Sequence, residues 1–153
     1  MSHPRSLIIL ALIILFLVGC GGGEKSDAPE LSPDGLTPYQ LKNGIGPITT
    51  RVFYEAIDTA MVARGKATFD VKCVACHKVE ARLVGPPLEN VTKRRSPEFI
   101  MNMILNPEGM VKQHPEVKAM LATYYVPMTF QNVTQQDARD ILEYLRTQET
   151  EEE

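Results

Sequence analysis

Residues 73–77 read Cys73-Val74-Ala75-Cys76-His77, and this stretch decides how the rest of the chain is interpreted. Two cysteines three positions apart place both thiols on one face of a helical turn, and a histidine follows the second cysteine directly. This is the spacing at which a c-type haem is attached. A five-residue pattern also occurs by chance, so a redox-active dithiol, half of a zinc site and a stretch without chemical function are competing interpretations.

The other cysteine and histidines favour haem over the two other chemical sites. The sequence holds three cysteines and three histidines, so only one cysteine and two histidines lie outside the motif. A structural zinc site needs four ligands, and a thioredoxin-like dithiol needs a βαβ surround that the sequence lacks. We therefore expect one covalently attached haem c, with thioether bonds to Cys73 and Cys76 and with His77 as the proximal iron ligand.

Residues 1–19 have the pattern of a secretory signal peptide. Positions 7–18 form an unbroken apolar run of 12 residues, which is too short for a membrane-spanning helix and typical of the central region of a signal. The run ends at Leu17-Val18-Gly19-Cys20, which resembles a bacterial lipobox. We therefore expect lipidation at Cys20, and the alternatives are a plain signal that leaves Cys20 free or a short uncleaved anchor. Lipidation predicts an exported protein, anchored at the outer face of the cytoplasmic membrane or in the periplasm.

Residues from about 60 to 148 resemble a class I monohaem cytochrome c. The parts that carry the resemblance follow in order along the chain: a helix with Gly65 and Phe69, the haem motif, Gly85-Pro86-Pro87-Leu88, Val126-Pro127-Met128-Thr129-Phe130, and a last amphipathic helix with Tyr144. Together with the lipobox they indicate the membrane-anchored lipoprotein form found in bacteria. The resemblance implies an all-α cytochrome c fold, in which a few short helices surround one covalently bound haem.

The resemblance also implies roles for single residues. In this family the carbonyl of the proline after the glycine accepts the hydrogen of the proximal histidine Nδ1, which corresponds to Pro86 and leaves Nε2 of His77 facing the iron. Leu88 is expected to pack against the haem. Met128 is expected to be the distal iron ligand because it lies in the loop before the last helix, and the alternatives are His114 or an open sixth position.

The chain is expected to have five parts: a lipoprotein signal peptide (1–19), the lipidated Cys20 with a flexible tether (20–36), an N-terminal extension that packs on the domain (37–57), the cytochrome c domain (58–148) and a solvated, frayed acidic tail (149–153). Within the domain, helices are predicted from Asp58 or Thr59 to about Lys72, from Ser96-Pro97 to Asn106-Pro107, from Pro115, and after Thr134, which pairs with Asp137. The apolar residues of 48–54 alternate and predict one short strand in the extension.

Electron transfer is the expected function, because the sequence contains no separate catalytic constellation and a methionine on the iron fills the position that a substrate needs. The alternative from another class is a peroxidase-like enzyme or gas sensor with an open sixth position. A third interpretation is a docking or assembly lipoprotein whose haem is only structural. As a carrier, the protein is expected to shuttle electrons between respiratory complexes outside the cytoplasmic membrane, and no nucleic-acid partner is expected.

Charge indicates what kind of partner the carrier meets. The whole chain has a net charge of −3, whereas residues 61–100 contain eight Lys and Arg against four Asp and Glu, a balance of +4. A basic rim around a haem edge steers toward partners with acidic docking surfaces. The alternative is that these cations are scattered over the surface, since clustering along the sequence does not require a patch in space.

Overall fold

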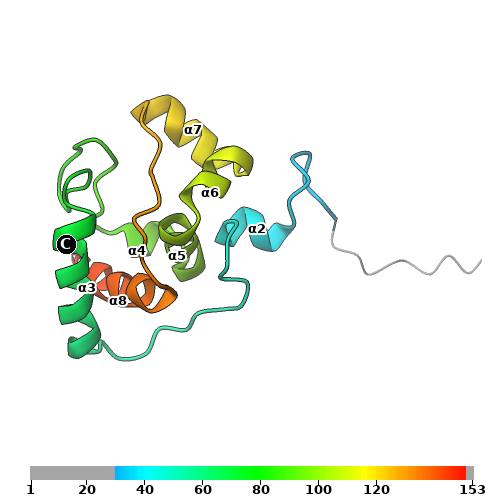
Figure 1. Ribbon diagram of the computed structural model, residues 1–153. Helices are drawn as coiled ribbons and strands as arrows, with labels where there is room; N and C mark the ends of the chain where they lie inside the picture. Colours follow the sequence, from blue (N-terminus) through cyan, green and yellow to red (C-terminus); the bar gives the residue numbers. More distant parts are fainter. Residues whose placement is uncertain (1–29, 151–153) are drawn as a thin grey trace, which may run out of the picture.

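The computed structural model describes residues 30–150, and in this range the chain forms helices and loops without any β-strand (Figure 1). In chain order the helices are α2 (Pro38–Asn43), α3 (Thr59–Lys72), α4 (Val91–Arg94), α5 (Pro97–Leu105), α6 (Pro107–Gln113), α7 (Pro115–Tyr124) and α8 (Gln135–Arg146). The all-α prediction is therefore confirmed. Cys20 and the predicted signal peptide lie outside the described residues.

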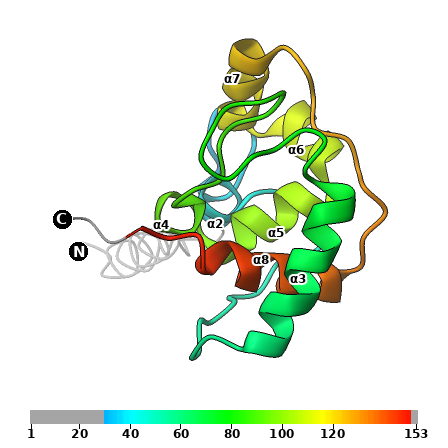
Figure 2. The same cartoon turned by 90° about the vertical axis from the view of Figure 1, so that its left-hand side faces the viewer.

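The fold is built around the crossing of α3 and α8, the most extensive helix contact in the described residues (Figure 2). A Cβ atom at Gly65 of α3 would overlap the backbone carbonyl of Asp140 in α8, so the two backbones touch. Beside this point Arg64 binds both carboxylate oxygens of Asp140, at 2.7 and 3.0 Å. The rings of Phe69 and Tyr144 pack with centroids 5.3 Å apart. Gly65, which has no side chain, allows this close crossing.

Local sequence signals determine where the helices begin. Asp58 accepts hydrogen bonds from the first N–H groups of α3, Ser96 caps α5, and Thr134 forms a reciprocal capping box with Asp137 at the start of α8. These predicted starts are confirmed. The short helices α2, α4 and α6 are not predicted from the sequence. Helix α6 is missed because Asn106-Pro107 ends α5 and, in the same two residues, caps and begins the next helix.

The extension formed by residues 37–57 packs on the domain, but the strand predicted for residues 48–54 is not formed. Its backbone bonds to side chains of α5. The fully buried amide of Asn102 accepts the N–H of Ile48 at 2.9 Å and donates to the carbonyls of Asn43 and Ile48 at 3.0 Å each. Glu98 accepts the N–H of Val52 at 2.6 Å. The strand prediction was wrong because a strand needs a second strand to pair with, and α5 offers polar side chains here.

A second, smaller core contains Phe99, Met110 and Val117, from α5, α6 and α7. Beside it, at the junction of α6 and α7, lies His114, which is 1% exposed. The Nε2 atom of His114 is 3.1 Å from the carbonyl oxygen of Leu41, so Nε2–H donates this bond. His114 therefore joins the extension to the corner between α6 and α7.

The first two residues of the predicted acidic tail are bound to the segment around α4. The Thr92 hydroxyl donates to the carboxylate of Glu149 at 2.5 Å, the N–H of Thr150 donates to the amide oxygen of Asn90 at 2.9 Å, and the Lys93 ammonium donates to the Thr150 carbonyl at 2.6 Å. The expectation of a frayed tail is wrong for Glu149 and Thr150, because polar groups near α4 bind them. Residues 151–153 lie outside the described range.

Replacing Gly65 by alanine tests the α3–α8 crossing. The new methyl group has to displace the carbonyl of Asp140, so Gly65→Ala should lower the free energy of unfolding by about 2–3 kcal/mol. Denaturant unfolding of the haem-containing protein measures this loss. The exposed neighbour Lys66 is the control, since Lys66→Ala should change stability by only about 0.5 kcal/mol. An equally small change for Gly65→Ala would show that the two backbones are not in contact.

Candidate haem site

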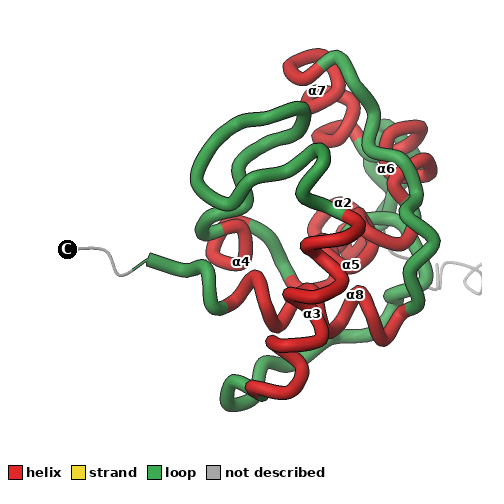
Figure 3. The backbone as a smooth tube through the Cα atoms, turned by 60° about the vertical axis from the view of Figure 1, so that its left-hand side comes forward, coloured by secondary structure: helices red, strands yellow, loops and turns green. Residues whose placement is uncertain are grey.

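A cavity of about 320 Å³ lies between the end of α3, helices α5 and α7, and the loops that follow α3 and α7. In Figure 3 the loop after α3 lies on the left and the loop after α7 on the right, with α7 above them. The walls are mostly apolar. They include all the residues predicted from the sequence to contact the haem: Cys73, Cys76, His77, Pro86, Leu88 and Met128. A preformed apolar cavity with a few polar groups is typical of a cofactor site.

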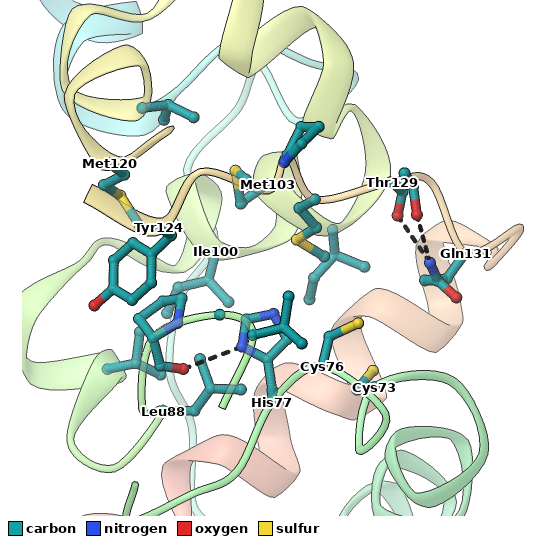
Figure 4. Close-up of a pocket in the computed structure, with 18 of the residues that line it drawn as sticks. Cys73, Cys76, His77, Leu88, Ile100, Met103, Met120, Tyr124, Thr129 and Gln131 are labelled. Carbon is teal, nitrogen blue, oxygen red and sulfur yellow. Dashed lines mark hydrogen bonds between the residues drawn. The ribbon is translucent and has the colours of Figure 1, made fainter. Parts of the chain in front are cut away.

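The haem motif forms a helical turn on one wall of this cavity (Figure 4). The N–H groups of Cys76 and His77 donate to the carbonyl of Cys73 at 3.1 and 2.9 Å, and the N–H of Gly85 donates to the carbonyl of Cys76 at 2.9 Å. Burial, with a smaller contribution from the Cys76 thiol, raises the pKa of Cys73 to about 11. Before haem attachment Cys73 is therefore a neutral thiol at pH 7.

The imidazole of His77 is oriented by the loop that follows the motif. Its Nδ1 lies 3.1 Å from the carbonyl oxygen of Pro86 (Figure 4). A carbonyl oxygen only accepts hydrogen bonds, so Nδ1 carries the hydrogen and the Nε2 lone pair is free for a metal. The ring also packs on Gly85, where a Cβ atom would overlap the imidazole and lie 2.9 Å from Nδ1. The Gly-Pro pair thus makes a turn and holds the histidine in one tautomer.

The cavity wall contains more methionines than the one predicted from the sequence. Met128 lines the cavity from the loop after α7, and Met103 of α5 and Met120 of α7 line it as well (Figure 4 labels these two). Met103 follows the apolar stripe of α5, which was a detectable signal for an inward position. His114 is not among the lining residues and is bonded to the Leu41 carbonyl. The cavity therefore favours a thioether over His114 as the second axial ligand.

Arg95, one of the basic residues of 61–100 that were expected to form a docking surface, lies at the cavity. Arg95 lines the cavity, forms an ion pair with Glu116 of α7 at 2.6 Å, and lies with its guanidinium carbon 4.9 Å from the ring centroid of Phe99. Arg95 is therefore engaged within the domain. Tyr124 also lines the cavity, whereas its neighbour Tyr125 is 82% exposed and is not among the lining residues.

The donor set in the cavity fits a covalently attached haem. Two thiols lie on one wall, an imidazole Nε2 is available beside them, and the rest of the wall is suited to an apolar ring. Among the described residues, no group of three or more Cys, His, Asp and Glu side chains is arranged to hold a metal ion by itself. When bound, haem supplies an iron that alternates between the ferric and ferrous states. Cys73 and Cys76 would hold the haem edge through thioether bonds, Nε2 of His77 would be available to the iron, and Met128 is the predicted second ligand.

Residues 62–149 match the protein-family model described as Cytochrome c. The chain belongs to the cytochrome c family. Among solved structures it is similar to cytochrome c from Rhodothermus marinus, with 42% identity over 72% of this chain and 96% of that chain, and a TM-score of 0.68. An engineered form of the Rhodothermus marinus protein has 41% identity over the same shares and a TM-score of 0.68. The engineered form bound to a carbene intermediate has 41% identity and a TM-score of 0.65. A search of curated proteins gave no match.

These matches confirm the resemblance to a class I monohaem c-type cytochrome, the cytochrome c fold and the cofactor. This cytochrome c binds haem c covalently, and Cys73 and Cys76 supply the two cysteines of the attachment motif. Haem-based electron transfer is the typical activity of the family, and its members are typically exported to the periplasm. The two axial roles assigned to His77 and Met128 stay predictions that the cavity geometry supports.

Replacing Gly85 by alanine tests how this cytochrome c orients His77. The added methyl group overlaps the imidazole, so Gly85→Ala should tilt the ring and weaken its bond to the iron. We expect a partly high-spin optical spectrum and a loss of about 1–3 kcal/mol in the free energy of unfolding. Pro87→Ala is the matched control in the same turn and should keep the wild-type spectrum. A wild-type spectrum for Gly85→Ala would contradict the contact between Gly85 and His77.

Proposed function

We propose that this cytochrome c is a membrane-tethered electron carrier. In this proposal it passes single electrons between respiratory complexes outside the cytoplasmic membrane, for example from a quinol-oxidising complex to a terminal oxidase or a nitrogen-oxide reductase. The observation that supports this most directly is that His77 and Met128 line one apolar cavity. A histidine and a methionine together fill both axial positions of an iron, and neutral methionine raises the reduction potential relative to a second histidine.

The surroundings of the two ligands suit repeated electron exchange. His77 is fixed by the carbonyl of Pro86 and by contact with Gly85, so its nitrogen changes position little when the iron changes charge. The apolar wall excludes water from the ligands, which favours the ferrous form because the net charge of the site is then smaller. The first effect keeps the site similar in its two oxidation states, and the second raises its reduction potential.

An enzyme or gas sensor needs an open or easily vacated sixth position. The engineered relative from Rhodothermus marinus is described as bound to a carbene intermediate, which shows that this kind of fold has been adapted to hold a reactive group. In the present chain we propose that Met128 fills the corresponding position, so that carrying electrons is the primary activity and catalysis is not. A haem with only a structural role would exchange electrons too slowly to serve a respiratory chain.

The tether is proposed from the sequence alone. The lipobox-like Leu17-Val18-Gly19-Cys20 supports lipidation at Cys20, with the residues after it as the tether. The tether predicted for residues 20–36 ends earlier than expected, because Leu36 is buried and its N–H donates to the Ser32 hydroxyl at 3.1 Å. Among the described residues, no helix is long and apolar enough to cross a membrane. A carrier on such a tether stays near its membrane and still rotates to meet a donor and an acceptor.

Whether Met128 is the sixth ligand of the iron decides between an electron carrier and an enzyme. The oxidised wild-type protein should be low-spin, with a weak far-red sulfur-to-iron charge-transfer band and a positive reduction potential. Met128→Ala should abolish the band, lower the potential, allow carbon monoxide to bind the ferrous protein and raise peroxidase activity. Optical spectroscopy and redox titration of the purified protein measure these changes.

The other methionines supply the controls for that experiment. Met103→Leu and Met120→Leu keep apolar volume in the cavity and should retain the far-red band, as should Met101→Leu, which changes a buried methionine outside the cavity wall. Loss of the band in one of these variants would assign the ligand to that residue. Rapid carbon monoxide binding by the wild-type protein, without a sulfur band, would replace the carrier by a gas-binding or peroxidase-like protein.

Docking to an acidic partner is proposed to depend on Lys72 and Lys78. Both lysines are exposed next to the haem motif, and Lys72 lines the cavity. The second-order rate of electron transfer to an acidic redox partner should fall on the order of tenfold in Lys78→Glu at low salt. The wild-type rate should also fall as ionic strength rises, because salt screens the attraction. Stopped-flow kinetics with Arg51→Glu as a remote control measures this, and a rate that rises with salt would exclude steering by these lysines.

A further inference from the structure

Helix α7 forms a wall of the haem cavity that has few helical neighbours. Its side chains Val117, Met120, Leu121 and Tyr124 line the cavity. In the described residues its only extensive helix packing is with α6, and Figures 1 and 2 show it at the end of the molecule farthest from the α3–α8 crossing. The position of α7 therefore depends strongly on contacts other than its packing on α6.

Arg82 supplies such a contact from the loop that follows the haem motif. Its Nη2 donates to the carbonyl of Thr123 at 3.0 Å, and its guanidinium carbon lies 4.5 Å from the ring centroid of Tyr124. The two sides of this contact are 41 positions apart in the sequence. Thr123 is in the last turn of α7, where carbonyl groups lack partners in the helix and where a cation is favoured by the helix dipole. Arg82 thus caps α7 and covers an aromatic ring of the cavity wall.

The capped end of α7 leads directly to the predicted sixth ligand. Tyr125 ends the helix with a left-handed backbone (φ 63°) that is strained for a residue other than glycine, and its N–H donates to the carbonyl of Leu121 at 2.8 Å. Val126 and Pro127 follow, and then Met128. Met128 lies four positions after Tyr124, the residue whose ring Arg82 covers, so a shift of the helix end is passed on to Met128 over a short, proline-stiffened segment.

We propose that Arg82 is a positioning residue for the sixth ligand: it latches the loop after the haem motif to the end of α7 and thereby slows dissociation of Met128 from the iron. One end of the latch belongs to the segment that orients His77, and the other to the segment that presents Met128. The same guanidinium therefore ties the loop after the haem motif to the end of the helix that leads to Met128. This inference rests on the proposed histidine–methionine ligation.

The other end of α7 is held in a similar way. Arg95, from the connection between α4 and α5, pairs with Glu116 in the first turn of α7. Two arginines thus hold the two ends of one helix, and both come from the stretch between the haem motif and α5. Arg82 is the more informative of the two because it acts next to Met128, whereas Arg95 also lines the cavity and stacks on the second core.

The effect of Arg82 on the dissociation rate of Met128 can be measured by exchange of the sixth ligand, without a redox partner. Imidazole in excess displaces methionine from ferric haem, and at saturating imidazole the observed rate equals the rate at which Met128 leaves. Imidazole is neutral at pH 8.5, so loss of the Arg82 charge does not alter its attraction to the site. We expect Arg82→Gln to raise this limiting rate about tenfold, equivalent to about 1.4 kcal/mol in the barrier. Arg82→Lys keeps a donor for the Thr123 carbonyl but loses planar stacking, and it should give an intermediate rate.

A matched control separates the latch from a general effect of losing an exposed arginine. Arg51 also lies over an aromatic ring, with its guanidinium carbon 5.1 Å from the centroid of Phe53, but it belongs to the extension and does not line the cavity. Arg51→Gln should keep the wild-type exchange rate. Denaturant unfolding of both variants is measured in parallel, and the latch requires faster exchange in Arg82→Gln at a free energy of unfolding close to that of Arg51→Gln.

The results of these measurements distinguish a failure of the Arg82 latch from a failure of the proposed function. A normal far-red sulfur band with equal exchange rates in wild type, Arg82→Gln and Arg51→Gln overturns the latch and leaves the carrier assignment intact. A wild-type protein without the sulfur band overturns both. If Arg82→Gln yields no haem-containing protein, the rate of Arg82→Lys decides, because an unchanged rate there also overturns the latch.

Discussion

The hydrogen bond from His77 Nδ1 to the carbonyl of Pro86 is the interaction on which the site depends. It sets the imidazole tautomer, and with it the direction in which Nε2 offers its lone pair. The bond forms only because Gly85 leaves room for the ring and because the N–H of Gly85 returns to the carbonyl of Cys76. Attachment motif, turn and proximal ligand are therefore one unit, and a change in any of the three moves the other two.

The haem cavity lies between two apolar cores and borders both. Phe69, Ile141 and Leu145 of the larger core line it, as do Phe99 and Val117 of the smaller one. A chain of this size has a limited core of its own, and without a disulfide between Cys73 and Cys76 it relies on other crosslinks. A haem joined to both cysteines would fill the cavity between the two cores. Stability and electron transfer would then depend on the same group.

The sequence was informative where one short pattern corresponds to one local geometry. The motif at residues 73–77 and the caps at Asp58, Ser96 and Thr134 were read correctly on that basis. It failed where the partner lies far along the chain. The alternating residues 48–54 meet Asn102 and Glu98 in place of a second strand, and Glu149 meets Thr92. No pattern within the extension or the tail records these partners.

The positive charge of residues 61–100 is a second case in which the sequence does not reveal the partners, because its lysines and arginines make different contacts in the structure. Arg64, Arg82 and Arg95 contact Asp140, Thr123 with Tyr124, and Glu116 respectively, so they join elements of the fold. Lys72 and Lys78 remain exposed beside the haem motif. A planar guanidinium binds two groups at once, whereas a lysine ammonium stays hydrated at little cost. Lys93 also joins two parts of the fold through the Thr150 carbonyl, so position in space, and not residue type, separates these cations from Lys72 and Lys78. A count of charges along the chain does not contain that distinction.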